Sequence, residues 1–299
     1  RPPVVIAGGP DRFRRMTTPM IRIADPGDDR LADYRELRDA DLRGTRRLFT
    51  VESERVLARF LDSGWRPESV LVEAEVAERL HARLEVLEAD VPVYVAEPGA
   101  LREISGYGFH GGALALGSRR QVLQGLEPVE SLLARRRSTI LAAEGVVHVD
   151  NMGALFRNAS SLGAEGVLLS PDCSDPLLRK SIRISTGRVF QVPWAICDPW
   201  PGTIDLLRRD HGFRVIGLEN TSGASDIEGM EYADRCVLLV GAEGSGLREA
   251  TLQLCDQVLE IPGIGDDQSR SLNVAVASAI GLHEVGRRRR RADDLDLGS

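Results

Sequence analysis

The stretch Cys236-Val-Leu-Leu-Val-Gly-Ala-Glu-Gly-Ser-Gly246 decides how this chain is expected to fold. Its apolar run is too short for a helix and ends in a glycine-rich turn, which is typical of a strand buried on both faces of a parallel sheet. A second short run, Val258–Ile261, ends at Pro262 and Gly263 in the same way. Two strands therefore bring glycine-rich loops to one sheet edge, where α/β proteins bind ligands.

The residue order of this turn differs from the two common phosphate-binding loops. Gly241-Ala-Glu-Gly-Ser-Gly246 has neither the Gly-x-Gly-x-x-Gly order of a dinucleotide site nor the Gly-Lys-Ser/Thr ending of a P-loop. Glu243 would also repel a phosphate. An acidic side chain among bare backbone groups favours a neutral or cationic ligand. The alternative is an ordinary strand-to-helix turn without a ligand.

The composition is ordinary for a soluble globular protein, with 42% hydrophobic and 28% charged residues. The net charge of −7 does not indicate a nucleic-acid partner. Arginines nevertheless cluster locally, and clusters on one shared face can bind RNA, whereas solvated surface is the alternative. The clusters are Arg12 to Arg15, Arg43 to Arg47, Arg119-Arg120, Arg135 to Arg137 and Arg287 to Arg291.

Several classes of protein are not indicated by the sequence. The four cysteines form no Cys-x-x-Cys pair, so we expect reduced, buried thiols. The five histidines lie far apart, so we expect no metal site. No apolar run approaches the ~18 residues of a membrane helix, and residues 1–20 lack the apolar core of a signal peptide. The expected location is therefore the cytoplasm, with no membrane partner.

Apolar periodicity predicts an α/β chain with two units, consistent with a length of 299 residues. In the first unit, strands are expected at 48–51, 69–72, 91–95 and 111–117, and helices at 52–62, 75–89 and 101–105. An arginine-rich stretch with Pro128 then marks a boundary. The expected division is a tail at 1–30, a small α/β domain at 31–118, a linker at 119–137, a second domain at 138–292 and a tail at 293–299.

The second unit is predicted to hold strands at 138–143, 165–170, 189–192, 213–217, 236–240 and 258–261 and helices at 154–162, 177–185, 204–210 and 271–284. Three strand ends, at Leu218, Gly241 and Ile261, would converge on one pocket. Arg157 stands near the start of a helix, where the dipole disfavours a cation. Such an arginine usually has a partner, although a solvated surface position is the alternative.

With these residues assembled, the second unit resembles the catalytic domain of the SpoU (TrmH) family of RNA ribose methyltransferases, within the SPOUT class. Three motifs in order carry the resemblance across about half of the chain. The first unit is similar, more loosely, to the small RNA-binding domain of many family members through Leu48–Glu52 and Gly112–Ala115. The motifs are Asn151-Met-Gly153 followed by Arg157 and Ala159, then Leu239 to Leu247, then Ile261-Pro262 with Gly265 and Ser271-Leu-Asn273.

The resemblance implies a C-terminal SPOUT domain with a trefoil knot, S-adenosylmethionine (AdoMet) as cofactor, and a homodimer formed through this domain. It implies an RNA substrate, with ribosomal RNA favoured and transfer RNA possible. Gly263 stands where the family usually has Met, which puts the shape of the pocket in question. The residues implied in AdoMet binding are Leu218, Glu219, Gly241, Ala242, Glu243, Gly244, Ile261, Gly263, Gly265, Ser271 and Leu272.

The implied reaction moves a methyl group from a sulfonium to a ribose 2′-hydroxyl, which must be aligned and lose its proton. Arg157 matches the arginine proposed to activate this hydroxyl. Because a guanidinium is a poor base, we expect Arg157 to hold the adjacent phosphate and stabilise the developing alkoxide. Asn151, Ser271 and Asn273 would orient ribose and cofactor, and Glu243 would hold Arg157 or Asn273.

Two other functions remain open from the sequence. A noncatalytic RNA-binding protein could retain the fold, and a related knotted enzyme could methylate a base nitrogen instead of a ribose. AdoMet binding separates the first from an enzyme, and analysis of the methylated product separates the second from a ribose methyltransferase.

Overall fold

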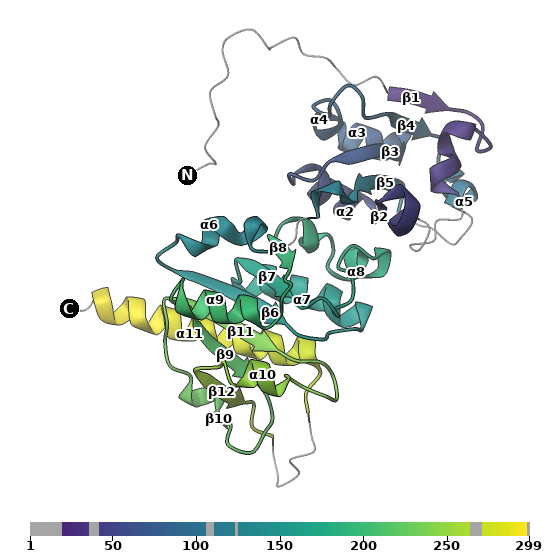
Figure 1. Cartoon of the computed structure of the whole chain (residues 1–299). Helices are drawn as coiled ribbons and strands as arrows, with labels where there is room; N and C mark the ends of the chain where they lie inside the picture. The colour runs from purple at the N-terminus through teal and green to yellow at the C-terminus, as the bar shows by residue number, and fades with distance from the viewer. Residues whose placement is uncertain (1–19, 36–41, 106–110, 123–124, 264–270, 298–299) are drawn as a thin grey trace.

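The structure, a computed structural model, describes residues 20–35, 42–105, 111–122, 125–263 and 271–297. Figure 1 shows two α/β units, with the smaller, N-terminal one placed above the larger one. Each unit is built on its own sheet, of five and seven strands respectively. The predicted α/β class and the order of the two units are confirmed.

The small unit has a mixed sheet in the order β1-β4-β3-β5-β2. β1, β4 and β3 run parallel, and β5 is antiparallel to both β3 and β2. The strands are β1 (Met20–Ile23), β2 (Leu48–Glu52), β3 (Pro67–Glu73), β4 (Val93–Ala96) and β5 (Ala113–Ser118). The helices are η1 (Asp29–Tyr34), η2 (Leu42–Arg46), α2 (Glu54–Leu61), α3 (Ala74–Arg79), α4 (His81–Leu84) and α5 (Ala100–Ser105).

Two expectations for this unit need correction. β1 belongs to the sheet, although residues 1–30 were predicted to be a tail; Met20–Ile23 pairs with β4 along its whole length. The predicted helix at 75–89 is two short helices, because Leu80 leaves helical geometry at φ −99° and ψ 6°. The small domain therefore begins inside the predicted tail.

The large unit is a parallel sheet in the order β10-β12-β9-β11-β6-β7-β8. Its strands are β6 (Ser138–Ala143), β7 (Gly166–Leu169), β8 (Trp194–Ile196), β9 (Arg214–Leu218), β10 (Ser225–Asp226), β11 (Arg235–Val240) and β12 (Gln257–Glu260). Its helices are α7 (Val149–Leu162), α8 (Arg179–Ile184), η5 (Arg188–Phe190), α9 (Gly202–Arg209), η6 (Ile227–Gly229), α10 (Glu249–Leu252) and α11 (Val274–Leu297). The stretch before it carries η3 (Arg119–Gln121), η4 (Glu127–Val129) and α6 (Glu130–Leu133).

Both faces of this sheet are buried, as its continuous apolar strands require. In β6, Leu141 and Ala143 join the core that includes α7 and α11, whereas Ile140 and Ala142 join the core that includes α9. This alternation follows from the two-residue period of a strand. The central strands are therefore held by packing on both faces, and ligands can be reached only from loops at the strand ends.

Three boundaries in the large unit differ from prediction. The run 189–192 is not a strand, because Gly187 turns the chain at φ +77° into η5 and the strand follows later, at β8. α7 begins at Val149, so that Asn151 lies inside the helix rather than before it. α11 continues to Leu297, so residues 293–297 are helical and not part of a tail.

An aromatic cluster joins the two units. Phe190 of η5 lies 5.5 Å from Phe49, 5.0 Å from Phe60 and 6.0 Å from Trp65 between ring centroids, and Trp65 stacks on Trp194 at 6.1 Å. Such contacts contribute beyond the area they bury. An ion pair between Glu52 of β2 and Arg179 of α8 lies at the same boundary. The small domain is thus packed against the large one rather than only tethered to it.

Candidate active site

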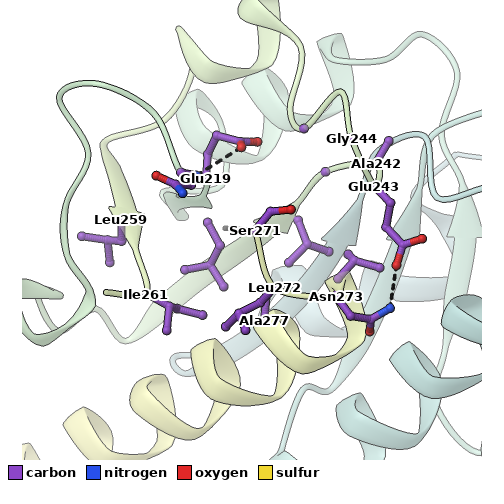
Figure 2. A pocket seen from close by; sticks show the side chains of 16 residues that line it. Glu219, Ala242, Glu243, Gly244, Leu259, Ile261, Ser271, Leu272, Asn273 and Ala277 are labelled. Carbon is purple, nitrogen blue, oxygen red and sulfur yellow. Dashed lines mark hydrogen bonds between the residues drawn. The ribbon is translucent and has the colours of Figure 1, made fainter. Parts of the chain in front are cut away.

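A cavity of about 330 Å³ opens at the carboxyl ends of β9, β11 and β12. Figure 2 shows its residues reaching inward from three loops and from the first turn of α11. The strand ends at Leu218, Gly241 and Ile261 all line it, which confirms that these three loops converge. The wall combines apolar side chains with polar ones, so the cavity can bind a ligand that has both apolar and polar parts. The volume lies near the lower end of the ~300–1,000 Å³ range of such sites.

The glycine-rich turn is packed too tightly for side chains at two positions. A Cβ at Gly241 would lie 2.2 Å from the carbonyl carbon of Gly246. A Cβ at Gly246 would lie 2.3 Å from Glu219 Oε2, and Gly246 has a φ of +66°. Glycine is therefore required here by close approach, and at Gly246 also by backbone conformation.

Glu219 holds this turn in place. Its Oε2 accepts a hydrogen bond from Leu247 N at 2.6 Å, and its Oε1 accepts one from Asn220 N at 3.1 Å. Glu219 was expected to contact the cofactor, and it does line the cavity. Part of its bonding capacity is nevertheless used within the protein, so it also shapes the site.

Glu144 anchors the turn from behind, a role that the sequence analysis missed. This carboxylate is 1% exposed. It accepts hydrogen bonds from Arg248 N at 2.8 Å, Trp200 Nε1 at 2.7 Å and Thr251 Oγ1 at 2.7 Å. A buried carboxylate satisfied in this way fixes the elements that surround it. Leu247 and Arg248 are thus each held by a glutamate through the backbone N–H.

A hydrogen-bonded cluster of Asn151, Glu243 and Asn273 lies at the edge of the cavity. Glu243 Oε1 accepts from Asn151 Nδ2 at 2.7 Å and from Asn273 Nδ2 at 2.5 Å. Asn273 Nδ2 also donates to Asn151 Oδ1 at 2.9 Å. Figure 2 shows the contact between Glu243 and Asn273 directly beside the cavity. Three residues from three motifs therefore meet, and Glu243 holds Asn273 as expected.

Asn273 is fixed at both ends of its amide. Its Oδ1 accepts from Ala275 N at 3.0 Å and Val276 N at 3.4 Å, which caps the start of α11. Its Nδ2 is held by the cluster described above. The start of α11 and the edge of the cavity are thereby positioned by one side chain.

The remaining candidates fall into three groups. Ser271 and Leu272 line the cavity, as do Ala242 and Gly244. Gly263 is exposed and does not line it, and Gly265 lies outside the described residues. Arg157 is exposed on α7 and is not part of the lining, and within the described part of the chain no carboxylate pairs with it. Glu243 therefore does not hold Arg157 in this chain, which was one of its two expected partners.

Other lining residues were missed because their sequence signal is only that of a packed element. Val240 and Leu259 are strand residues, and Val274 and Ala277 form the first turn of α11. His148 was also missed; its Nε2 lies 3.6 Å from Glu243 Oε2. The full set not predicted is Asn220, Val240, Gly246, Leu259, Val274 and Ala277 in the lining, with His148 beside it.

The described residues give no indication of a metal centre, a membrane span or a reactive thiol among Cys197, Cys236 and Cys255. These residues contain no cluster of three or more histidine, cysteine, aspartate or glutamate side chains suited to a metal. None of the described helices combines the length and apolar character needed to cross a membrane. The four cysteines are free. Burial raises the pKa of Cys197, Cys236 and Cys255 to about 12, so these thiols are poor nucleophiles at neutral pH.

Comparison with solved structures identifies this fold as that of RNA methyltransferases. A crystal structure of an RNA 2′-O ribose methyltransferase superposes with a TM-score of 0.70 at 25% identity, covering 91% of this chain and 99% of that one. The fold is also that of an AdoMet-bound rRNA methyltransferase from Sinorhizobium meliloti, with a TM-score of 0.73 at 22% identity over 90% of this chain and 98% of that one.

Sequence relatives then define the family. Residues 138–283 match the SpoU rRNA Methylase family. An uncharacterized tRNA/rRNA methyltransferase of Mycobacterium tuberculosis is 32% identical over 271 residues, which are 88% of this chain and 90% of the relative. The 23S rRNA (guanosine-2′-O-)-methyltransferase RlmB of Acinetobacter baylyi is 28% identical over 243 residues, 81% and 93% of the two chains. The chain belongs to the SpoU rRNA methylase family.

Proposed function

We propose that this protein transfers the methyl group of AdoMet to a ribose 2′-hydroxyl of RNA, and that the RNA is ribosomal. The observation that carries the proposal is the cluster of Asn151, Glu243 and Asn273 at the edge of a cavity formed by three strand ends. Relatives named as rRNA or tRNA/rRNA methyltransferases support the choice of substrate, with transfer RNA as the alternative.

The residues of the cavity suit AdoMet. Leu218, Val240, Leu259 and Ile261 provide an apolar surface for an adenine ring. Glu243 is a carboxylate at the edge of the same cavity, where a cationic group is favoured and a phosphate is not. The glycines of the turn let its backbone line the cavity directly, since Gly241, Gly244 and Gly246 present no side chain there. This arrangement fits a flat, apolar ring joined to a positively charged centre.

AdoMet, when bound, supplies a methyl group on a sulfonium. The protein must place the 2′-oxygen in line behind this methyl group and accept or disperse the charge that develops there. Because Glu243 fixes both amides, Asn151 and Asn273 need no reorganisation before the reaction. Ser271 adds a hydroxyl at the cavity wall. These groups would orient the ribose and the cofactor.

Arg157 would hold the phosphate next to the reacting ribose and stabilise the alkoxide, because a guanidinium cannot act as an effective base at neutral pH. It does not line the cavity of its own chain. We therefore infer that the site is completed in a homodimer, with Arg157 supplied by the partner. Exposed apolar side chains support such an interface, since Leu272 and Val276 are each 47% exposed and Val147 is 60% exposed.

A trefoil knot in the C-terminal domain belongs to this proposal. β12 pairs with β9 on one side of β11, whereas α11, which follows β12, packs against α7 and β11. The C-terminal segment thus returns across the sheet, as it must if it passes through a loop of the same domain. The connection between β12 and α11 at 264–270 lies outside the described residues.

The experiment is methyl transfer from labelled AdoMet to ribosomal RNA taken from a strain that lacks the protein. Nuclease digestion and mass spectrometry of the product should reveal one 2′-O-methylated nucleoside. Methyl incorporation into transfer RNA alone would show that transfer RNA, and not ribosomal RNA, is the substrate. A methyl group on a base would show that the protein methylates bases and not ribose. Absence of AdoMet binding in calorimetry would leave a noncatalytic RNA-binding protein.

A further inference from the structure

Four arginines meet where the small domain touches the large one. Arg55 and Arg59 lie one turn apart on α2, Arg157 lies on α7, and Arg188 begins η5. We call these four residues the arginine junction. Figure 1 shows α2 at the edge of the small unit that faces the large unit.

Hydrogen bonds position two arginines of the junction, Arg59 and Arg188. Arg59 Nη1 donates to the carbonyl oxygen of Thr186 and, at 2.7 Å, to Thr186 Oγ1. Arg188 Nη1 donates to Ser160 Oγ at 2.9 Å and to Gln191 Oε1 at 3.3 Å. Ser160 lies one turn after Arg157 on the same face of α7. Elements from both domains therefore direct guanidinium groups to one region.

The turn that positions these arginines is strained. Thr186 has a φ of +52°, which is unusual for a β-branched residue. A Cβ at Gly187 would lie 3.2 Å from Val56 Cγ1, so α2 packs directly on this turn. The strained residue is the one whose carbonyl and hydroxyl bind Arg59. Backbone strain of this kind concentrates at functional sites.

The arginine junction has no neutralising carboxylate. Among the described residues, none of its four arginines lies within 4.0 Å of an acidic oxygen, although most other described arginines form an ion pair. The nearby Glu52 is already paired with Arg179. Burial lowers the pKa of Arg59, and the positive charges of Arg188, Arg55 and Arg157 lower it further. These four guanidinium groups therefore repel one another, although the chain as a whole carries a net charge of −7.

We propose that Arg55, Arg59 and Arg188, together with Arg157, bind backbone phosphates of the substrate RNA across the boundary of the two domains. Uncompensated, preoriented guanidinium groups are suited to phosphate oxygens, which they bind through two hydrogen bonds. Under the proposed function, Arg157 holds the phosphate next to the ribose in the cavity of the partner. The other three arginines, whose positive charges act together with that of Arg157, would therefore bind nucleotides that flank the methylated one. This inference rests on the proposed function.

The test measures RNA binding rather than methylation. The probe is a fluorescein-labelled, single-stranded RNA of mixed sequence, and its anisotropy gives Kd from about 50 to about 400 mM KCl. For the double variant Arg55→Ala and Arg188→Ala, we expect weaker binding and a slope of log Kd against log salt that is smaller by about 0.7 per lost contact. The variants Arg55→Lys and Arg188→Lys should keep most of the slope.

A matched control removes two arginines that do have carboxylate partners. Arg83 pairs with Asp62 in the small domain, and Arg209 pairs with Asp205 in the large domain. The double variant Arg83→Ala and Arg209→Ala should bind the RNA with the wild-type slope. Thermal unfolding and AdoMet calorimetry, unchanged in all variants, would show that fold and cofactor site are intact.

Equal salt slopes for the wild type and the Arg55→Ala, Arg188→Ala variant would overturn the arginine junction, even if the wild type methylates RNA. Conversely, a wild type that neither binds AdoMet nor methylates RNA would refute the proposed function, while the binding data would still decide the role of these arginines. The two proposals can therefore fail separately.

Discussion

Asn151 and Asn273 lie 122 positions apart in the chain and donate to the same carboxylate oxygen of Glu243, while Asn273 Nδ2 also contacts Asn151 Oδ1 at 2.9 Å. The arrangement joins the start of α7 to the start of α11. Loss of either amide would remove the bond between the two asparagines and leave Glu243 with one donor fewer.

Asn151→Ala should lower the rate of methyl transfer by about 100-fold, because a small displacement of an orienting group is sufficient for such a loss. Asn158→Ala is the matched control on the same helix. Asn158 Nδ2 donates to Ala275 O at 2.6 Å and Ser278 Oγ at 3.0 Å, so it joins α7 to α11 without bonding to Asn151, Glu243 or Asn273. This control should cost about 1 kcal/mol of stability and retain activity. Equal activity losses in both variants would contradict the role of Asn151.

Gly241→Ala should weaken AdoMet binding at least about tenfold, because a methyl group that must displace backbone reshapes the cavity wall. Its Cβ would lie 2.2 Å from the carbonyl carbon of Gly246. Gly263→Ala is expected to leave the affinity within about twofold, since open space surrounds that position. Calorimetry with AdoMet measures both. A large effect at Gly263 would restore the sequence-based expectation that this residue contacts the cofactor.

Arg157→Ala should reduce methyl transfer by about 100-fold to 1,000-fold, the cost of losing one group that stabilises developing charge. The exposed position of Arg157 predicts an unchanged melting temperature. Co-expression with Asn273→Ala provides a test of the dimer. Mixed dimers would combine an intact Asn273 with an intact Arg157 from the partner, and activity should return. If purified mixed dimers remain inactive, Arg157 does not act in the active site of the partner.

Glu284 should make part of the stability depend on pH. Burial of its carboxylate raises its pKa, but hydrogen bonds from Arg287 and Arg288 outweigh this and hold the pKa below the ordinary value of 4.5. A carboxylate whose pKa is lower in the folded state stabilises fully above its unfolded pKa, and the effect is lost as pH falls through the folded pKa. Glu284→Gln should therefore cost about 1 kcal/mol at neutral pH.

Urea unfolding at neutral pH and at about pH 3 tests this pH dependence. The difference in the free energy of unfolding between the Glu284→Gln variant and the wild type should shrink in acid. Glu78→Gln serves as the control at an exposed position. It should change the free energy of unfolding by no more than about 0.5 kcal/mol at either pH. A difference for Glu284→Gln that persists unchanged in acid would contradict the linkage.

The sequence predicted the site better where the chain is constrained locally. Short apolar runs that end in glycine, as at Val240-Gly241, predict buried strands. The convergence of the three loops was inferred from these strands, and the cavity confirms it. The strand predicted at 189–192 was wrong. Phe190 in this run packs against Phe49 and Phe60 of the other domain, and apolar periodicity cannot reveal such a contact. The arginine junction was beyond prediction for the same reason, since its members are distant in sequence.

The aromatic cluster around Phe190 also bears on how a nucleotide is chosen. Because Phe49, Phe60 and Trp65 pack on it, the reach between α2 and the cavity is set by contact and not by the length of a tether. Under the proposed function, this fixed spacing would select the RNA by its shape. An RNA would have to fold so that a ribose reaches a cavity while neighbouring phosphates contact the arginine junction.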